Sequence, residues 1–337
     1  MTTDALSKEL KAGRLRPVYF FYGDERFLLE NRLNSIRKRT VAPGFEDFNF
    51  FRFSGKKVSL EAVIEAVEQF PQMSDKKLVL VQDSGFLQNT AAKEYKRIKT
   101  LVGELPDYVC LVFTEEAFDK KKEKNLAFIE EAGGGVVAFD YLPAGKLELW
   151  IEERFEKAGI RVLPSDISYL VRICGQSMGK LDMEFQKLTS YLGSRTKLTR
   201  ADIDAVVDRT VEYRVYDMLA NMIDSRSEKA REQLKFLQDT KEKPHVVLGI
   251  MMGKLSELLL CKRLKEDGLS QQEIGQYFDF KRPAFAVKKT IEESKRFGEP
   301  YLMRMLDKGL KYDLDIKTGR MDGWTAVELY LAELTLL

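Results

Sequence analysis

The turn after the first apolar run resembles a phosphate-binding loop in shape but lacks the residues for that chemistry. A phosphate-binding loop has the pattern G-x-x-x-x-G-K-[ST]. Its backbone N–H groups surround the phosphates, and its Lys and hydroxyl meet the terminal phosphates and Mg²⁺. Counted from Gly23, the last three positions of the pattern are Leu28, Leu29 and Glu30. Because the second Gly, the Lys and the hydroxyl are all missing, we expect this turn not to bind a nucleotide.

Other residues that could carry chemistry lack the partners that chemistry requires. Asp83 follows an apolar run, where a nucleotide hydrolase holds its magnesium-binding acid, but the next residue is Ser84 rather than a second acid, so we interpret Asp83 as structural. His245 is the only histidine, which excludes a histidine triad or a multi-histidine metal site within one chain. Cys110 and Cys261 stand in apolar runs typical of buried free thiols. We therefore predict no catalytic residues, no metal site and no cofactor.

The composition is that of a soluble protein with more than one domain. The 337 residues are 44% hydrophobic and 32% charged, with a formal net charge of only +2. Basic and acidic residues are balanced along the chain, whereas a protein that binds DNA alone usually carries a basic domain or face. The sequence contains no uninterrupted apolar run near the ~20 residues of a membrane span, and its first residues lack the apolar core of a signal peptide. We expect a cytoplasmic protein with no membrane partner.

The elements that must position these residues change in type along the chain. Five runs typical of strands, separated mainly by helical patterns, predict an α/β region with a mostly parallel sheet. These runs are residues 18–22, 48–53, 78–82, 108–113 and 136–139. A Gly-rich segment that ends at Pro143 closes the region, and only helical patterns follow. The predicted fold class is therefore α/β plus all-α.

The helical part divides by the length of its helices. Three medium helices and a short fourth predict a small helical domain over residues 141–210. Longer helices follow from about residue 211 to the end. The sequence thus predicts three domains, at residues 1–140, 141–210 and 211–337.

A loop between a helix and the third strand contains both polar and large apolar residues. In "EQFPQMSDKKLVLV", residues 68–81, Phe70 and Met73 lie on either side of Pro71. Pro71 disfavours helical geometry at Phe70, so the helix should end there. The two side chains could insert into a pocket of another protein, or they could cover the core beneath the loop. Spacing alone does not separate these alternatives.

The segment "LSQQEIGQYFDFKRPAFAVKK", residues 269–289, predicts two short helices around a turn. Ser270 and Glu273 form the pattern of a capping box at the first helix. The pair could be a helix-turn-helix DNA reader, with phosphates bound by Lys281, Arg282 and their neighbours Lys288 and Lys289. The many apolar residues of both helices and the neutral charge of the region favour a helical hairpin packed into a core instead.

Several of these segments together resemble the delta subunit family of bacterial DNA polymerase III. The resemblance rests on "PVYFFYGDERFLLE", "FPQMSDKKLVLV", "GLSQQEIGQYF" and "DLDIKTG", which occur in this order along nearly the whole chain. The middle segment "MEFQKLTSYLG" also matches, except that the family usually has Asn where this chain has Met183. That difference concerns a local helix contact rather than the resemblance as a whole.

The resemblance implies a clamp-loader subunit with three domains. They would be an AAA+-like α/β domain with a degenerate phosphate loop, a helical lid, and a helical collar that joins a hetero-pentamer. Implied partners are the sliding clamp (the beta subunit), the delta prime and gamma/tau subunits, and primer-template DNA within the assembled complex. The subunit would belong to a polymerase holoenzyme without having an active site of its own.

In that family the clamp-contacting residues sit on the loop before the third strand. They correspond here to Phe70, Gln72 and Met73. We expect these side chains to form a hydrophobic wedge that opens the clamp, and Lys76 and Lys77 to steer it towards an acidic clamp surface. Two alternatives belong to other functional classes: a divergent P-loop ATPase, which would bind ATP, and a helix-turn-helix protein, which would bind DNA alone in a steeply salt-dependent way.

Overall fold

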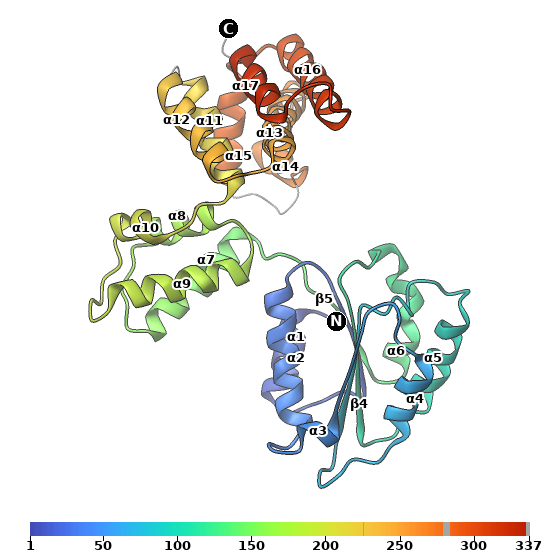
Figure 1. Ribbon diagram of the computed structural model, residues 1–337. Coiled ribbons are helices and arrows are strands. Elements are labelled where there is room, and N and C mark those ends of the chain that lie inside the picture. The colour runs from blue at the N-terminus through green and yellow to red at the C-terminus, as the bar shows by residue number, and fades with distance from the viewer. Residues whose placement is uncertain (225, 279–283, 335–337) are drawn as a thin grey trace. The chain divides into compact units, whose positions relative to one another are not determined.

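The computed structural model describes residues 1–224, 226–278 and 284–334 (Figure 1). The chain forms two compact units, Met1–Tyr141 and Leu142–Leu337. The first unit combines a sheet with helices, and the described part of the second consists of helices joined by loops. The predicted class, α/β plus all-α, is confirmed.

A parallel five-stranded sheet forms the centre of the first unit. Its strands are β1 (Val18–Tyr22), β2 (Phe50–Ser54), β3 (Lys77–Gln82), β4 (Val109–Glu115) and β5 (Gly135–Ala138). They lie in the order β2-β3-β4-β1-β5, and every neighbouring pair is parallel. Strands β1, β3 and β4 are buried along their whole length, which is why they are nearly continuous apolar runs. The predicted start of the second strand at residue 48 was wrong, because residues 46–49 form the short helix α3 (Glu46–Asn49).

Helices cover both faces of this sheet (Figure 1). Helices α1 (Thr3–Lys11) and α2 (Arg26–Thr40) pack on one face. Helices α4 (Leu60–Glu68), α5 (Lys93–Gly103) and α6 (Ala127–Glu131), preceded by the 3-10 helix η1 (Lys120–Leu126), cover the other. Because side chains alternate along a strand, β1 contributes to the two cores in turn. The sheet is thus a rigid layer that fixes both the chain turns at its edges and the helix ends beside them.

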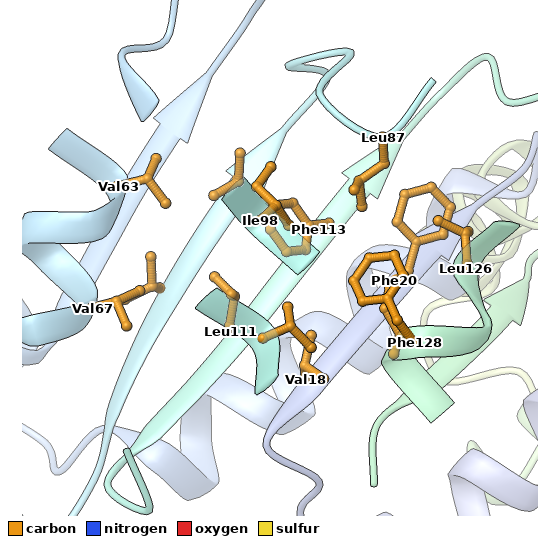
Figure 2. Close-up of a cluster of buried hydrophobic side chains, with 14 of the residues drawn as sticks. Val18, Phe20, Val63, Val67, Leu87, Ile98, Leu111, Phe113, Leu126 and Phe128 are labelled. Atoms are coloured by element: carbon orange, nitrogen blue, oxygen red, sulfur yellow. The ribbon is translucent and has the colours of Figure 1, made fainter. Parts of the chain in front are cut away.

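The larger of these cores orients helix α4. Figure 2 shows Val63 and Val67 of α4 pointing towards the strands, where Leu111 and Phe113 of β4 lie. Both valines are fully buried, and burying such side chains contributes about 1.5–3 kcal/mol each. Ser59 accepts a hydrogen bond from the backbone N–H of Ala62 and so caps the start of the helix. Helix α4 therefore holds the loop that follows it on a fixed base.

The second unit consists of eleven helices in its described residues. They are α7 (Ala144–Lys157), α8 (Pro164–Cys174), α9 (Met178–Leu192), α10 (Arg200–Val206), α11 (Val211–Ile223), α12 (Ser227–Asp239), α13 (Pro244–Glu266), α14 (Gln271–Gln276), α15 (Ala284–Ser294), α16 (Glu299–Lys317) and α17 (Gly323–Leu334). Helices α7 to α10 pack on one another, and α11, α12, α16 and α17 share a core with α13. The division of this unit at residue 210 into a lid and a collar stays a prediction.

Helix α13 is the one described helix that is long and apolar enough to cross a membrane by length and composition. Lys254 and Glu257 interrupt its apolar residues, so the sequence did not single it out. Val247, Leu248 and Met251 are fully buried in the core of the second unit. The buried side of this helix thus packs at the centre of a helical core.

Candidate functional site

The turn after β1 uses its own polar groups within the protein. The backbone N–H of Glu25 donates to the carbonyl oxygen of Phe139 at 2.8 Å, and the N–H of Phe139 donates to Tyr22 at 2.7 Å. Gly23 has φ +121°, and a Cβ atom there would lie 2.5 Å from that carbonyl oxygen. A backbone N–H of the turn is thus bound by the chain after β5. This supports the expectation that the turn binds no phosphate.

The side chains at the last three positions of the phosphate-loop pattern are also unsuited to binding phosphate. Leu29 is fully buried, Leu28 is partly buried against the same core, and Glu30 is exposed on α2. None of them is a cation or a hydroxyl that could meet a terminal phosphate. The positions of the phosphate-loop pattern are therefore taken by two residues that pack in the core and one that faces solvent.

Asp83 is bound by neighbouring groups of the protein. Its Oδ1 accepts a hydrogen bond from the backbone N–H of Glu116 at 2.8 Å. The guanidinium of Arg26 lies 3.7 Å from the same oxygen and 3.0 Å from the Glu116 carboxylate. Asp83 is thus held by a backbone N–H and lies close to a protein cation, which supports its structural interpretation.

The segment around residues 269–289 packs into a core. The predicted capping box is present, because Ser270 and Glu273 bond each other's backbone N–H groups. Ile274 of α14 and Val287 of α15 are buried in one cluster with Cys261 of α13. Lys288 and Lys289 are exposed, whereas Lys281 and Arg282 lie outside the described residues. The packed-hairpin interpretation is favoured over a DNA reader.

The loop between α4 and β3 presents apolar side chains to solvent. Phe70 is 75% exposed and Met73 is 82% exposed, the highest values among the large hydrophobic side chains that the structure describes. Side chains this exposed do not cover the core beneath the loop. Gln72 between them is also exposed. Large apolar side chains this exposed on one short loop are typical of a protein-binding surface.

Asn49 holds the middle of this loop. Its side chain is fully buried at the end of α3. Its Nδ2 donates to the carbonyl oxygen of Gln72 at 2.7 Å, and its Oδ1 accepts from the N–H of Gln72 at 2.8 Å. One planar amide therefore satisfies both backbone groups of one loop residue.

Lys77 holds the start of the loop from beneath. It is fully buried at the first position of β3. Its ammonium donates to the carbonyl oxygen of Ala66 at 2.6 Å and also to that of Gln69. Carbonyl groups in the last turn of a helix have no partner within the helix, and they attract cations. Burial lowers the pKa of Lys77 to about 8.

The position of Lys77 corrects one prediction from the sequence. We expected Lys76 and Lys77 to steer the loop together, but the Lys77 ammonium has no contact with solvent and is bound by α4. Lys76 is exposed and remains a candidate for steering. The sequence "SDKK" is typical of exposed charged residues, and no local pattern indicated that one of its lysines would bind the end of a helix.

Aromatic and backbone contacts complete the loop. The Tyr108 ring lies 5.2 Å from the Phe70 ring between centroids, and its hydroxyl donates to the carbonyl of Glu68 at 3.1 Å. Met73 has φ +51°, a left-handed backbone conformation that residues other than Gly adopt rarely. The Ser74 hydroxyl donates to the carbonyl of Lys76 at 2.9 Å. The loop is an ordered structure, held at both ends and in the middle.

Comparisons with known proteins agree with the resemblance found in the sequence. Residues 19–132 match the family described as DNA polymerase III, delta subunit, and residues 212–334 match the family described as DNA polymerase III delta subunit, C-terminal domain. DNA polymerase III subunit delta of Bacillus subtilis is 25% identical over 341 residues, covering 97% of this chain and 95% of that protein. A probable DNA polymerase III subunit delta of Aquifex aeolicus is 23% identical over 260 residues, covering 74% and 72%.

A solved structure from Bacillus subtilis has a similar fold over nearly the whole chain. The Bacillus subtilis DNA clamp loader delta protein matches with a TM-score of 0.63 and 23% identity, covering 99% of each chain. The match includes both the sheet-containing unit and the helical unit. It supports the arrangement of elements described above.

Proposed function

This chain belongs to the delta subunit family of DNA polymerase III, and we propose that it is the clamp-loader subunit that binds the sliding clamp and opens its ring without hydrolysing ATP. The observation that carries the proposal is the exposure of Phe70 and Met73 on an ordered loop. Phe70 contacts the Tyr108 ring but leaves most of its surface in solvent, and Met73 is more exposed still. The chemistry of this pair fits an apolar pocket of a partner protein.

The mechanism follows from differential binding. A closed ring is held by its own interface, and a ligand opens it only by binding the open or strained ring more tightly than the closed one. Burying the side chains of Phe70 and Met73 would contribute about 1.5–3 kcal/mol each before the costs of association. Gln72, exposed between them, would supply a polar contact that fixes their orientation. Helix α4 and strand β3, which the loop connects, would keep the two side chains in place while the open ring is bound.

ATP hydrolysis is assigned to other subunits of the assembly. The turn at Gly23 lacks the Lys and hydroxyl of a phosphate loop, and its N–H at Glu25 already donates to Phe139. The proposed partners are the sliding clamp, the delta prime and gamma/tau subunits, and primer-template DNA inside the assembled loader. The helices from α11 onwards would form the collar that joins the subunits. The working location would be the cytoplasm, where the replisome acts.

The test is binding to the sliding clamp of the same organism, measured by surface plasmon resonance without nucleotide. The variant Phe70→Ala with Met73→Ala removes both apolar side chains. Each lost side chain is worth about 1.5–3 kcal/mol, and every 1.4 kcal/mol is tenfold. We therefore expect wild-type binding without ATP and a loss of at least about 100-fold in the variant.

A matched control separates a general loss of apolar surface from a loss of the wedge. Met183→Ala with Phe236→Ala removes a methionine that is 59% exposed and a phenylalanine that is 42% exposed, both in the second unit. This control should bind like wild type. A well-folded wild-type protein that does not bind the clamp would refute the proposal, and a calorimetric ATP titration with measurable heat would favour the ATPase alternative.

A further inference from the structure

We infer that Asn49 is a positioning residue for clamp binding: it holds the loop of residues 70–73 in the conformation that presents Phe70 and Met73. The inference rests on the proposed function and goes beyond it, because Asn49 itself need not contact the clamp. It is fully buried. It acts through its two hydrogen bonds to the backbone of Gln72.

The first step of the argument is where Asn49 stands. It is the last residue of α3 and directly precedes β2, whose first residue Phe50 pairs with Leu78 of β3. The loop runs into β3 from the same end of the sheet. Asn49 directly precedes β2, and its amide bonds the chain before β3. The two segments are thus joined just before the first paired residues of the two strands. A group at the junction of a helix and a strand is a rigid support for a loop.

The second step is the chemistry of the contact. An asparagine amide carries a donor and an acceptor on one plane, and here both are used by one residue, at 2.7 and 2.8 Å. A buried amide without partners is costly, so the loop and the side chain stabilise each other's position. The pairing imitates the two hydrogen bonds of a strand neighbour. It places Gln72, and with it the residues on either side, at a fixed distance from the sheet.

The third step is the conformation that has to be held. Met73 follows Gln72 with φ +51°, and a residue in this region costs of order 1–3 kcal/mol unless its surroundings enforce it. Met73 is also 82% exposed, so its own side chain contributes little packing. The support must come from neighbouring backbone contacts, and Asn49 supplies two of them directly beside Met73.

The consequence for binding is a population effect. A loop free to move would present both side chains correctly for only part of the time, and the apparent Kd would rise by the inverse of that fraction. Removing the Asn49 amide should therefore weaken binding although every clamp-contacting side chain remains. The loss should appear mainly as slower association, because fewer molecules are competent at the moment of encounter.

The experiment is a double-mutant cycle on clamp binding by the full-length chain. It uses wild type, Asn49→Ala, Phe70→Ala with Met73→Ala, and the three substitutions together. We expect Asn49→Ala to lower affinity about tenfold or more. In the background without the two apolar side chains it should cost almost nothing further, because there is no wedge left to position.

Two further variants separate positioning from loss of stability. Asn49→Asp keeps the acceptor for the Gln72 N–H but places an oxygen against the Gln72 carbonyl oxygen at a buried site, so its affinity should fall at least as far as that of Asn49→Ala. Asn221→Ala removes another buried asparagine, one that bonds to Gln233 in the second unit, and should leave clamp affinity unchanged. A drop in affinity for Asn221→Ala equal to that of Asn49→Ala would assign the effect to general destabilisation and overturn the inference.

A measurement without the clamp tests the same idea independently. Hydrogen exchange at the amides of residues 70–73 should become faster in Asn49→Ala, with exchange in β4 unchanged. Unchanged exchange in the loop overturns the inference, as does full clamp affinity of Asn49→Ala. Absence of clamp binding by wild type would instead overturn the proposed function, and with it the role assigned to Asn49.

Discussion

The buried ammonium of Lys77 makes the stability of the first unit depend on pH. Burial lowers its pKa from 10.5 to about 8. Below about pH 8 the lysine is charged in both the folded and the unfolded protein, and the folded state carries the full cost of burying the charge. Between about pH 8 and 10.5 the unfolded chain keeps its proton while the folded protein releases it, so stability rises with pH.

The size of the effect follows from the two pKa values. A lowering from 10.5 to about 8 corresponds to about 3 kcal/mol between the charged and neutral forms. Over the accessible range from about pH 7.5 to 9.5, the linkage relation predicts a gain of about 2 kcal/mol. Lys77→Met keeps a long unbranched side chain and removes the titrating group, so this gain should be absent from the variant.

The assay is urea unfolding of the full-length protein at several pH values, followed by circular dichroism. Both tryptophans, Trp150 and Trp324, lie in the second unit. Their fluorescence therefore identifies the unfolding transition of the second unit, and the remaining transition seen by circular dichroism belongs to the first unit. The difference between wild type and Lys77→Met should change by about 2 kcal/mol in favour of wild type as the pH rises to about 9.5. Lys76→Met, which removes an exposed lysine, should keep the wild-type pH dependence. An identical pH dependence in wild type and Lys77→Met would refute the reasoning.

Two further predictions concern the steering lysine and the degenerate turn. Lys76→Glu should slow association with the clamp several-fold at low salt and change dissociation little, with the difference shrinking as salt is raised; an effect confined to dissociation would contradict a steering role. Gly23→Ala should destabilise the first unit by about 2 kcal/mol or more, because its Cβ would meet the Phe139 carbonyl oxygen at 2.5 Å in a backbone conformation of φ +121°. The matched control Gly13→Ala has φ +76° with no atom within 4 Å of the added Cβ, so in urea unfolding it should cost only about 1 kcal/mol; equal costs would mean that the close approach at Gly23 is relieved by movement of the chain.

Local patterns determined much of this fold. The fully buried strands β1, β3 and β4 were readable because a strand covered on both faces must be apolar throughout. The capping box at Ser270 was readable because its two residues stand three positions apart. The missing phosphate chemistry at Gly23 was also readable, since the absent Lys and hydroxyl are fixed positions in a short pattern.

The candidate site was located by the sequence only in part. Phe70 and Met73 stood out beside Pro71, but spacing left open whether they faced solvent or the core. Whether they face solvent depends on packing between residues far apart in the chain, such as Phe70 and Tyr108. Only the folded chain could decide between the two.

The supports of the loop were decided entirely by tertiary structure. Asn49 and Gln72 are 23 positions apart in the chain, and no local pattern connects them. Lys77 looked like solvated charge, yet it is buried because the strand that it begins passes beneath the unpaired carbonyl groups at the end of α4. The sequence determined which side chains could bind a partner, whereas contacts between distant segments decided how they are presented, because hydrogen bonds to a loop backbone depend on where the sheet brings the chain together.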